Sequence, residues 1–288
     1  MNTSDLPAAY SGTFLLGGDL EVRRMAFGAM RLTGKGIWGP PRDRAEAIRL
    51  LRRLPHLGVN FIDTADSYGP QVSEELVAEA LSPYPPNLVI ATKGGLVRPG
   101  PGEWRRDGRP EKLRAACEGS LARLRLERID LYQLHAPDPN VPLEDSLGEL
   151  ARLQIEGKIR HIGLSSVRPE ELERARRVVR VVSVQNRYNL EDRISDNVLT
   201  VCERDGLGFI PWFPLAAGPL ASRQGAVLRV AHRHGATTAQ VALAWLLQRS
   251  PVVILIPGTA SIAHLEENVA AAKLHLSDAD LSELAQGA

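Results

Sequence analysis

The feature that most constrains the fold is a regular alternation of short apolar runs with longer amphipathic stretches. Each apolar run has the length and composition of a buried strand, and each amphipathic stretch has room for a helix. Eight such runs occur along the 288 residues. They are residues 24–27, 60–63, 88–92, 131–134, 161–164, 183–185, 209–212 and 252–256.

The stretches between the runs carry the start and stop signals of helices. Asp43 can cap a helix over 44–54, with Gly58 just beyond its end, and Pro110 suits the first turn of the next. Apolar residues recur at helical spacing in the other stretches. The pattern predicts helices at 44–54, 110–124, 143–154, 169–179, 192–205, 239–248 and 278–285, with two further short helices at 224–234 and 262–272.

Eight strand–helix units without an internal linker predict a closed (β/α)₈ barrel, an α/β fold of the TIM type. We expect one domain over residues 1–288, with a core from about 20 to 285. Residues 13–16 and 20–22, joined by a Gly-Gly-Asp turn, predict a short amino-terminal hairpin. A doubly wound open sheet is the alternative, but no Gly-x-Gly-x-x-Gly turn follows an early strand.

Composition and charge limit the partners. The 35 basic and 34 acidic residues leave a formal net charge of +1, which gives no reason to expect nucleic acid or an anionic membrane. The cysteines, Cys117 and Cys202, predict neither a disulfide framework nor a metal cluster. No apolar run reaches 18 residues and no basic start precedes an apolar stretch. We therefore expect a cytoplasmic protein that does not span a membrane.

Three consecutive apolar runs end on ionisable residues, namely Asp63, Lys93 and His135, and Tyr68 follows soon after the first. The carboxyl ends of neighbouring barrel strands meet at one mouth, so these groups should converge. A nearby cation favours a phenolate, so Lys93 is expected to lower the pKa of Tyr68 while Asp63 orients Lys93. His135 can hydrogen-bond a substrate oxygen. Taken singly, each residue also has a purely structural interpretation, but the set suits protonation of a carbonyl oxygen during hydride delivery.

The segments that carry these residues resemble the aldo-keto reductase superfamily. The resemblance spans about residues 20–285 and includes 61–69, 90–94, 130–135, 161–166, 256–259 and 264–268. It implies a (β/α)₈ barrel that binds a nicotinamide cofactor without a Rossmann domain. It also implies Tyr68 as general acid, with Asp63, Lys93 and His135 as its catalytic partners.

The resemblance further implies the cofactor contacts. Ser165 and Gln185 would hold the nicotinamide carboxamide, Trp212 would stack on the ring, and the remaining residues would surround the phosphates and the adenosine. The full set is Gly28, Met30, Ser165, Ser166, Gln185, Trp212, Pro214, Leu215, Gly218, Pro257, Gly258, Thr259, Ser261, His264, Glu267 and Asn268.

The cofactor expected from the resemblance is NADPH, with NADH as the alternative. Many members of the superfamily place Lys and Arg where Gly258 and His264 stand, to hold the adenosine 2′-phosphate. Thr259, Ser261, backbone amides and a protonated His264 could still bind that phosphate.

Substrate contacts are expected from Trp38, Trp104, Tyr68 and His135. The subgroup that the chain resembles most includes bacterial pyridoxal reductases, which points to pyridoxal or a related aromatic aldehyde reduced to its alcohol. The long segment 94–109 carries Trp104 and three arginines that could meet an anionic substrate group, Arg98, Arg105 and Arg106. A monomer is favoured, although the sequence does not determine the oligomeric state.

Two other functions fit parts of the pattern. A redox-sensing regulatory subunit could hold the cofactor with little turnover, and an intact Tyr68–Lys93 pair does not exclude it. A metal hydrolase barrel could use Asp63, Asp66 and His135 as ligands. That interpretation lacks a His-x-His strand end, and Lys93 would oppose the charge of the metal, so no metal is expected.

Overall fold

A curled parallel sheet forms the centre of the computed structural model, which describes residues 6–215 and 224–286. Its seven strands are hydrogen-bonded side by side in the order in which they occur along the chain. They are β3 (Phe27–Gly28), β4 (Phe61–Asp63), β5 (Val89–Gly94), β8 (Ile129–Leu134), β9 (Ile159–Ser165), β10 (Val181–Arg187) and β11 (Gly208–Trp212). The other strands of the described residues form two separate small sheets.

The eighth predicted strand closes this sheet into a barrel. The amide of Leu255 donates to Arg24 O at 2.7 Å, and that of Ala26 donates to Leu255 O at 2.8 Å. On the other side, Ile254 donates to Phe209 O at 2.8 Å. Residues 252–256 therefore join β3 to β11 through isolated parallel bridges instead of a continuous ladder. The predicted (β/α)₈ barrel is confirmed.

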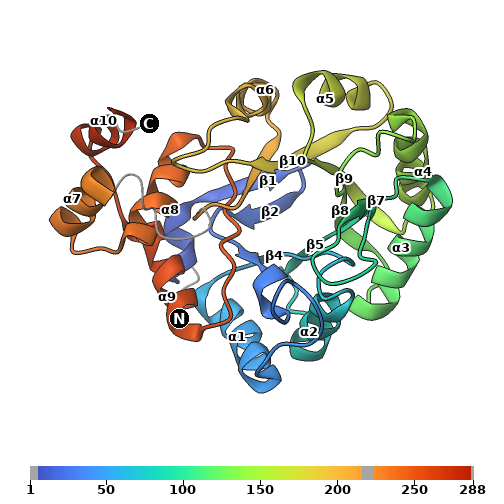
Figure 1. The fold of residues 1–288 in the computed structure, drawn as a ribbon, viewed down its shortest axis with the longest axis horizontal. Coiled ribbons are helices and arrows are strands. Elements are labelled where there is room, and N and C mark those ends of the chain that lie inside the picture. Colours follow the sequence, from blue (N-terminus) through green and yellow to red (C-terminus); the bar gives the residue numbers. More distant parts are fainter. Residues whose placement is uncertain (1–5, 216–223, 287–288) are drawn as a thin grey trace.

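Helices surround the barrel as a ring (Figure 1). The ring consists of α1 (Arg44–Leu57), α2 (Val72–Leu81), α3 (Pro110–Leu124), α4 (Leu143–Ile155), α5 (Pro169–Arg176), α6 (Asp196–Asp205), α8 (Thr238–Arg249) and α9 (Ile262–Ala270). None of the helices in the described part of the chain is long and apolar enough to cross a membrane. Short 3₁₀ turns lie at Pro7–Ser11, Ala29–Leu32 and Ala271–Lys273.

Two extra helices are present, as expected, but one of them is not where the pattern placed it. They are α7 (Gln224–His234) and α10 (Asp278–Gln286), which pack against each other beside the ring (Figure 1). The predicted extra helix at 262–272 is α9, which packs against α1 and α8 and completes the ring. The position of a helix relative to the ring depends on tertiary packing, which periodicity does not report.

The sequence pattern missed α2 entirely. The buried face of this helix includes Ser73 and Glu74 beside its apolar residues, so its apolar spacing is broken. Its amino-terminal cap residue, Gln71, has a φ of 70° and makes no side-chain cap bond. The helix thus lacks both of the signals by which the others were found. Two predicted helices are also shorter than expected, since α5 ends at Arg176 and α6 begins at Asp196.

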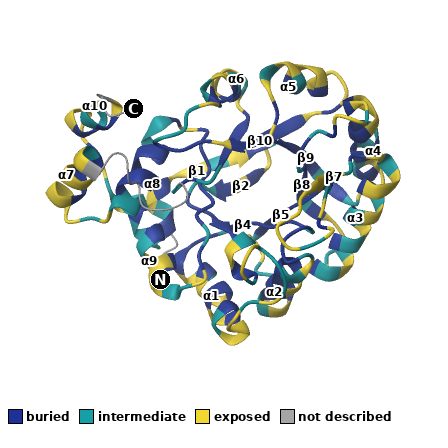
Figure 2. Cartoon of the chain, viewed as in Figure 1, coloured by how far each residue is buried: buried dark blue, intermediate teal, exposed yellow. Residues whose placement is uncertain are grey.

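The barrel has one core inside the sheet and another between the sheet and the helices. The strands of the sheet are accordingly coloured as buried in Figure 2. The predicted hairpin, β1 (Thr13–Leu16) and β2 (Leu20–Arg23), supplies Leu16, Leu20 and Val22 to the inner core. At the start of β11, a Cβ on Gly208 would lie 2.7 Å from the Leu16 side chain. The hairpin therefore covers the amino end of the barrel and leaves the carboxyl end for a binding site.

The segment 94–109, predicted as a loop without regular structure, contains a small antiparallel pair. Strand β6 (Leu96–Val97) pairs with β7 (Arg105–Arg106) over the carboxyl end of β5. This pairing returns the chain on itself, so the residues between the two strands are held close to the barrel mouth.

Replacement of Gly17 by Ala should destabilise the fold through the hairpin. Gly17 has a φ of 62°, and an added Cβ would lie 2.4 Å from the His161 ring. Gly206 has a φ of 65° in the left-handed region and open space around it, so Gly206→Ala isolates the backbone strain of about 1–2 kcal/mol. We expect Gly17→Ala to cost about 1–3 kcal/mol more than this control, measured by urea unfolding. Equal losses in the two variants would contradict this packing.

Candidate active site

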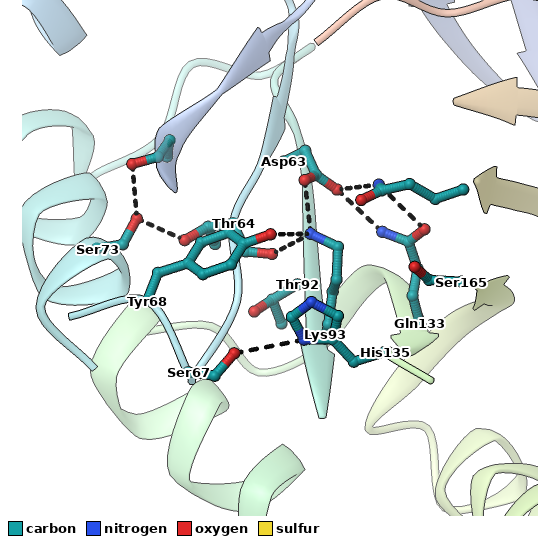
Figure 3. Close-up of polar contacts among 12 residues, drawn as sticks. Asp63, Thr64, Ser67, Tyr68, Ser73, Thr92, Lys93, Gln133, His135 and Ser165 are labelled. Carbon is teal, nitrogen blue, oxygen red and sulfur yellow. Dashed lines mark hydrogen bonds and ion pairs between the residues drawn. The ribbon is translucent and has the colours of Figure 1, made fainter. Parts of the chain in front are cut away.

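The carboxyl ends of β4, β5 and β8 bring the predicted ionisable residues together (Figure 3). Asp63 is the last residue of β4, Lys93 lies near the end of β5, and His135 follows β8 directly. Tyr68 comes from the loop between β4 and α2 and is buried, with 6% of its surface exposed. The predicted convergence of these residues is therefore present.

Lys93 is the centre of this group. Its ammonium donates to Asp63 Oδ1 at 2.6 Å, to Thr64 O at 2.9 Å and to the Tyr68 hydroxyl at 3.2 Å. An ammonium has three N–H groups, so each is used. The side chains of Lys93 and Asp63 are 0% and 2% exposed, which makes this a fully buried ion pair.

Asp63 is held from its other side by two amides. Gln133 Nε2 donates to Asp63 Oδ2 at 3.0 Å, and Gln185 Nε2 donates to the same oxygen at 2.9 Å. Both carboxylate oxygens are therefore hydrogen-bonded, as a buried carboxylate requires. The position of the Lys93 ammonium is fixed by this network and not by a flexible contact.

The effect of Lys93 on the Tyr68 pKa has the predicted sign, but it does not decide the direction of the net shift. Burial raises the pKa of Tyr68 above its ordinary value, and the nearby charge of Lys93 opposes that rise without cancelling it. Burial also acts to lower the pKa of Lys93, but the attraction of Asp63 and the contact with Tyr68 outweigh it and raise the pKa. At neutral pH the phenol is therefore protonated and the amine is charged. Burial is a tertiary property, so spacing along the chain could not reveal this balance.

His135 is partly buried beside this group. Its Nδ1 lies 3.3 Å from Ser67 Oγ, and its ring stands edge-on to the Tyr68 ring with centroids 5.8 Å apart. Burial, and then the charge of Lys93, hold the pKa of His135 well below its ordinary value. The imidazole is therefore neutral at physiological pH and carries one N–H.

A cleft of about 100 Å³ opens beside Tyr68 and Asp63. Half of the residues expected to contact the cofactor line it, and they come from both sides of the barrel mouth. They are Gly28, Met30, Gln185, Trp212, Pro214, Leu215, Pro257 and Gly258.

The other expected cofactor residues lie outside the lining of this cleft. Ser165 is buried at the end of β9, and its hydroxyl lies 3.4 Å from that of Ser166, which has a φ of 59°. Thr259, Ser261, His264, Glu267 and Asn268 lie along the start and length of α9. Gly218 falls outside the described residues.

Hydrogen bonds at the start of α9 order its amino terminus. Ser261 caps the helix by accepting from the amide of His264 at 3.5 Å, and its own amide donates to Thr259 Oγ1 at 3.1 Å. Glu267 accepts from the Thr237 hydroxyl at 2.6 Å, so this carboxylate is already engaged. The exposed side chain of His264 lies at the same end of the helix.

Sequence reasoning missed two residues of the site. Gln133 lies inside an apolar strand, where its single amide was not recognised as a partner for Asp63. Arg31 lines the cleft, and its Cγ would lie 3.3 Å from a Cβ on Gly258. The signal for Arg31 was present, because it directly follows Met30, which was assigned to the cofactor.

The expected substrate residues lie around His135. Trp104 stands edge-on to His135 with ring centroids 6.4 Å apart and is 39% exposed. Trp38 forms a bridge with Gly69 in the loop that follows Tyr68. Of the three arginines that could meet an anionic substrate group, Arg98 is buried and donates to backbone carbonyls, so it is not free for that role, whereas Arg105 and Arg106 are exposed.

The residues proposed as metal ligands do not form a cluster. Within residues 6–215 and 224–286, no group of three or more His, Cys, Asp or Glu side chains is arranged to hold a metal ion. Asp63 is committed to Lys93 and the two amides. Burial, and then the charge of Glu74, raise the pKa of Asp66 to about 8, which makes its carboxyl a poor ligand at neutral pH.

Comparison with known proteins agrees with this geometry. The model of the aldo/keto reductase family matches residues 24–287. The chain belongs to the aldo/keto reductase family. It is therefore an NAD(P)H-dependent oxidoreductase that acts on carbonyl and alcohol groups of small molecules.

Two relatives and one solved structure illustrate the likeness. An uncharacterized oxidoreductase of Schizosaccharomyces pombe is 50% identical over 283 residues, covering 98% of this chain and 92% of the relative. Pyridoxine 4-dehydrogenase of Escherichia coli is 45% identical over 282 residues, covering 95% and 97%. An aldo/keto reductase of Klebsiella pneumoniae in complex with NADP and acetate superimposes with a TM-score of 0.80 at 28% identity, covering 95% and 94%.

Proposed function

We propose that this reductase uses NADPH to reduce an aldehyde or ketone to an alcohol, with Tyr68 as the general acid. Asp63, Lys93 and His135 are its catalytic partners. The observation that carries the proposal is the double contact of Lys93, which reaches Asp63 at 2.6 Å and the Tyr68 hydroxyl at 3.2 Å beside a cleft.

The residues around the cleft fit a nicotinamide cofactor. Trp212 offers a partly exposed aromatic face, and Gln185 keeps a carboxamide oxygen that Asp63 does not use. At Gly28 and Gly258 a Cβ would collide with backbone oxygens at 2.5 and 2.7 Å, so this wall of the cleft is built from closely packed backbone. Ser165 and Ser166 would add hydroxyls for the nicotinamide end of the cofactor, and the amino terminus of α9 would be available to its phosphates.

The bound cofactor supplies the hydride, and the residues of the chain manage the proton. Tyr68 donates its phenolic proton to the carbonyl oxygen, which it can do because burial keeps it protonated at neutral pH. Lys93 lies close enough to stabilise the phenolate that remains, and Asp63 keeps Lys93 in place. In the tautomer in which His135 Nδ1 accepts from the Ser67 hydroxyl, Nε2 carries the proton and can donate to the same oxygen.

The substrate we propose is pyridoxal or a related aromatic aldehyde. The likeness to pyridoxine 4-dehydrogenase of Escherichia coli, at 45% identity, supports it. The aromatic rings of Trp104 and Tyr68, both edge-on to His135, offer surfaces that suit a flat ring.

Replacement of Tyr68 by Phe should abolish most of the reductase activity without loss of cofactor binding. General acid catalysis contributes about 10²–10⁴-fold, so kcat for an aromatic aldehyde should fall by that factor. Absorbance of NADPH reports turnover, and quenching of tryptophan fluorescence reports binding. Tyr10→Phe, at a tyrosine that is 54% exposed and remote from the site, serves as the control.

Full turnover in Tyr68→Phe would overturn the role of Tyr68. A wild-type protein that binds NADPH tightly but reduces none of pyridoxal, aromatic aldehydes and ketones would favour the regulatory alternative instead.

Replacement of Arg31 by Met should weaken NADPH binding by about tenfold, the effect of losing about 1.4 kcal/mol from one charged contact. Arg31 is an exposed cation at the edge of the cleft beside Gly258, and none of the described acidic side chains forms an ion pair with it. It can compensate for the missing cations at Gly258 and His264. Fluorescence titration with NADPH and NADH measures the effect, with exposed Lys35→Met as the control. An unchanged Kd for NADPH would contradict this role.

A further inference from the structure

The strongest unassigned feature near the site is the guanidinium of Arg98. Arg98 directly follows β6, and the residue is only 8% exposed. Among the described residues no carboxylate forms an ion pair with it, although buried arginines usually have such a partner. Burial lowers its pKa from the ordinary value, which leaves it a cation at neutral pH. When no opposite charge is present, hydrogen bonds must replace the water that a buried charge has lost.

Backbone carbonyls from three separate loops provide that compensation. Arg98 Nε donates to Glu103 O at 2.8 Å, within its own loop. The two terminal nitrogens donate to Ile37 O at 2.9 Å and Gly36 O at 3.2 Å, and more weakly to Ser67 O at 3.4 Å. The planar fork of a guanidinium can serve several acceptors at once, which a lysine ammonium cannot do in the same plane.

The same guanidinium contacts the two tryptophans expected at the substrate. Its central carbon lies 3.8 Å from the centroid of the Trp104 ring and 5.5 Å from that of Trp38. These are cation–π distances, and a poorly hydrated cation makes such contacts favourable. Trp104 in turn stands edge-on to His135. Arg98 thus contacts both tryptophans, one of which packs against the proposed catalytic residue His135.

The loop that carries Trp38 needs this support. Ile37 has a φ of 57°, a conformation that is unfavourable for a β-branched residue and persists only where the surroundings enforce it. Arg98 holds the carbonyls of Gly36 and Ile37 on either side of this strained peptide. The amide of Gly39 then donates to Gly69 O at 2.6 Å, which fixes the loop against the segment after Tyr68.

We propose that Arg98 is a positioning residue that assembles the substrate wall from these three loops, and so gives the site its preference for flat aromatic carbonyl compounds over small aliphatic ones. The part that concerns substrate choice rests on the proposed reductase function. A flat ring gains contact with Trp38 and Trp104 only while both are held in place. A small aliphatic aldehyde needs Tyr68 and His135 alone.

The test compares Arg98→Met and Arg98→Lys with Arg109→Met, an exposed arginine of the same loop whose partner is Asp107. Steady-state kinetics with NADPH use 4-nitrobenzaldehyde and propanal. For Arg98→Met we expect KM for the aromatic aldehyde to rise at least tenfold, while kcat and the parameters for propanal change less than threefold. Arg98→Lys should lie between Arg98→Met and the wild type. The control should keep the wild-type ratio of kcat/KM for the two aldehydes.

A second readout does not depend on turnover. Loss of the Arg98 contacts should free the segment around β7, so limited tryptic cleavage after Arg105 and Arg106 should accelerate at least tenfold in Arg98→Met and less in Arg98→Lys. The melting temperature and NADPH affinity identify any variant that fails to fold. If Arg98→Met fails to fold, Arg98→Lys is compared with Arg109→Met and the wild type in its place. If the wild type reduces neither aldehyde, the reductase function fails while cleavage still tests the assembly of the loops.

Two results would overturn the proposal. One is a cleavage rate of Arg98→Met equal to that of Arg109→Met, which would show that Arg98 does not hold the loops. The other is an unchanged ratio of kcat/KM for the two aldehydes despite faster cleavage, which would show that the wall does not set the preference.

Discussion

The rest of the site depends on one buried charge, the ammonium of Lys93. Placing this cation inside a protein costs several kcal/mol unless its partners are supplied. Asp63 supplies the opposite charge, Thr64 and Tyr68 supply acceptors, and two glutamine amides hold Asp63. Because these partners come from the loop after β4 and from three strands other than that of Lys93, namely β4, β8 and β10, the arrangement exists only when the barrel is closed. The geometry of the acid–base residues therefore depends on the closed barrel.

Closure of the barrel also determines where a ligand can bind. The hairpin β1–β2 fills the amino end with Leu16, Leu20 and Val22, and residues 252–256 join the two edges of the sheet. The open end carries the loops after each strand, as in other barrels of this kind. Acid–base residues occupy the part of the mouth formed by β4, β5 and β8, and the cleft extends from there to β11. Proton donor and proposed cofactor site thus meet at Tyr68.

The barrel and its four ionisable residues could be predicted from the sequence because both depend on the succession of residues along the chain. A side chain at the end of a strand stays at the barrel mouth whatever packs around it. Properties set by packing were not predictable. Burial decided the net direction of the Tyr68 pKa shift, and the mixed face of α2, with Ser73 and Glu74 buried, concealed that helix. Arg98 was one of three arginines that could meet a substrate anion, because two of the carbonyls that hold it, those of Ile37 and Ser67, lie far away along the chain.

The most direct test of the central claim is chemical rescue of Lys93→Ala by ethylamine. Removal of the ammonium should lower reductive turnover of an aromatic aldehyde by about 10²–10⁴-fold at neutral pH, because the Tyr68 phenolate loses its stabilising charge. Ethylammonium, which fits the space of the missing group, should restore part of the rate, while sodium chloride at the same concentration should not. Turnover at the wild-type rate without Lys93, in a variant that binds NADPH normally, would contradict the account.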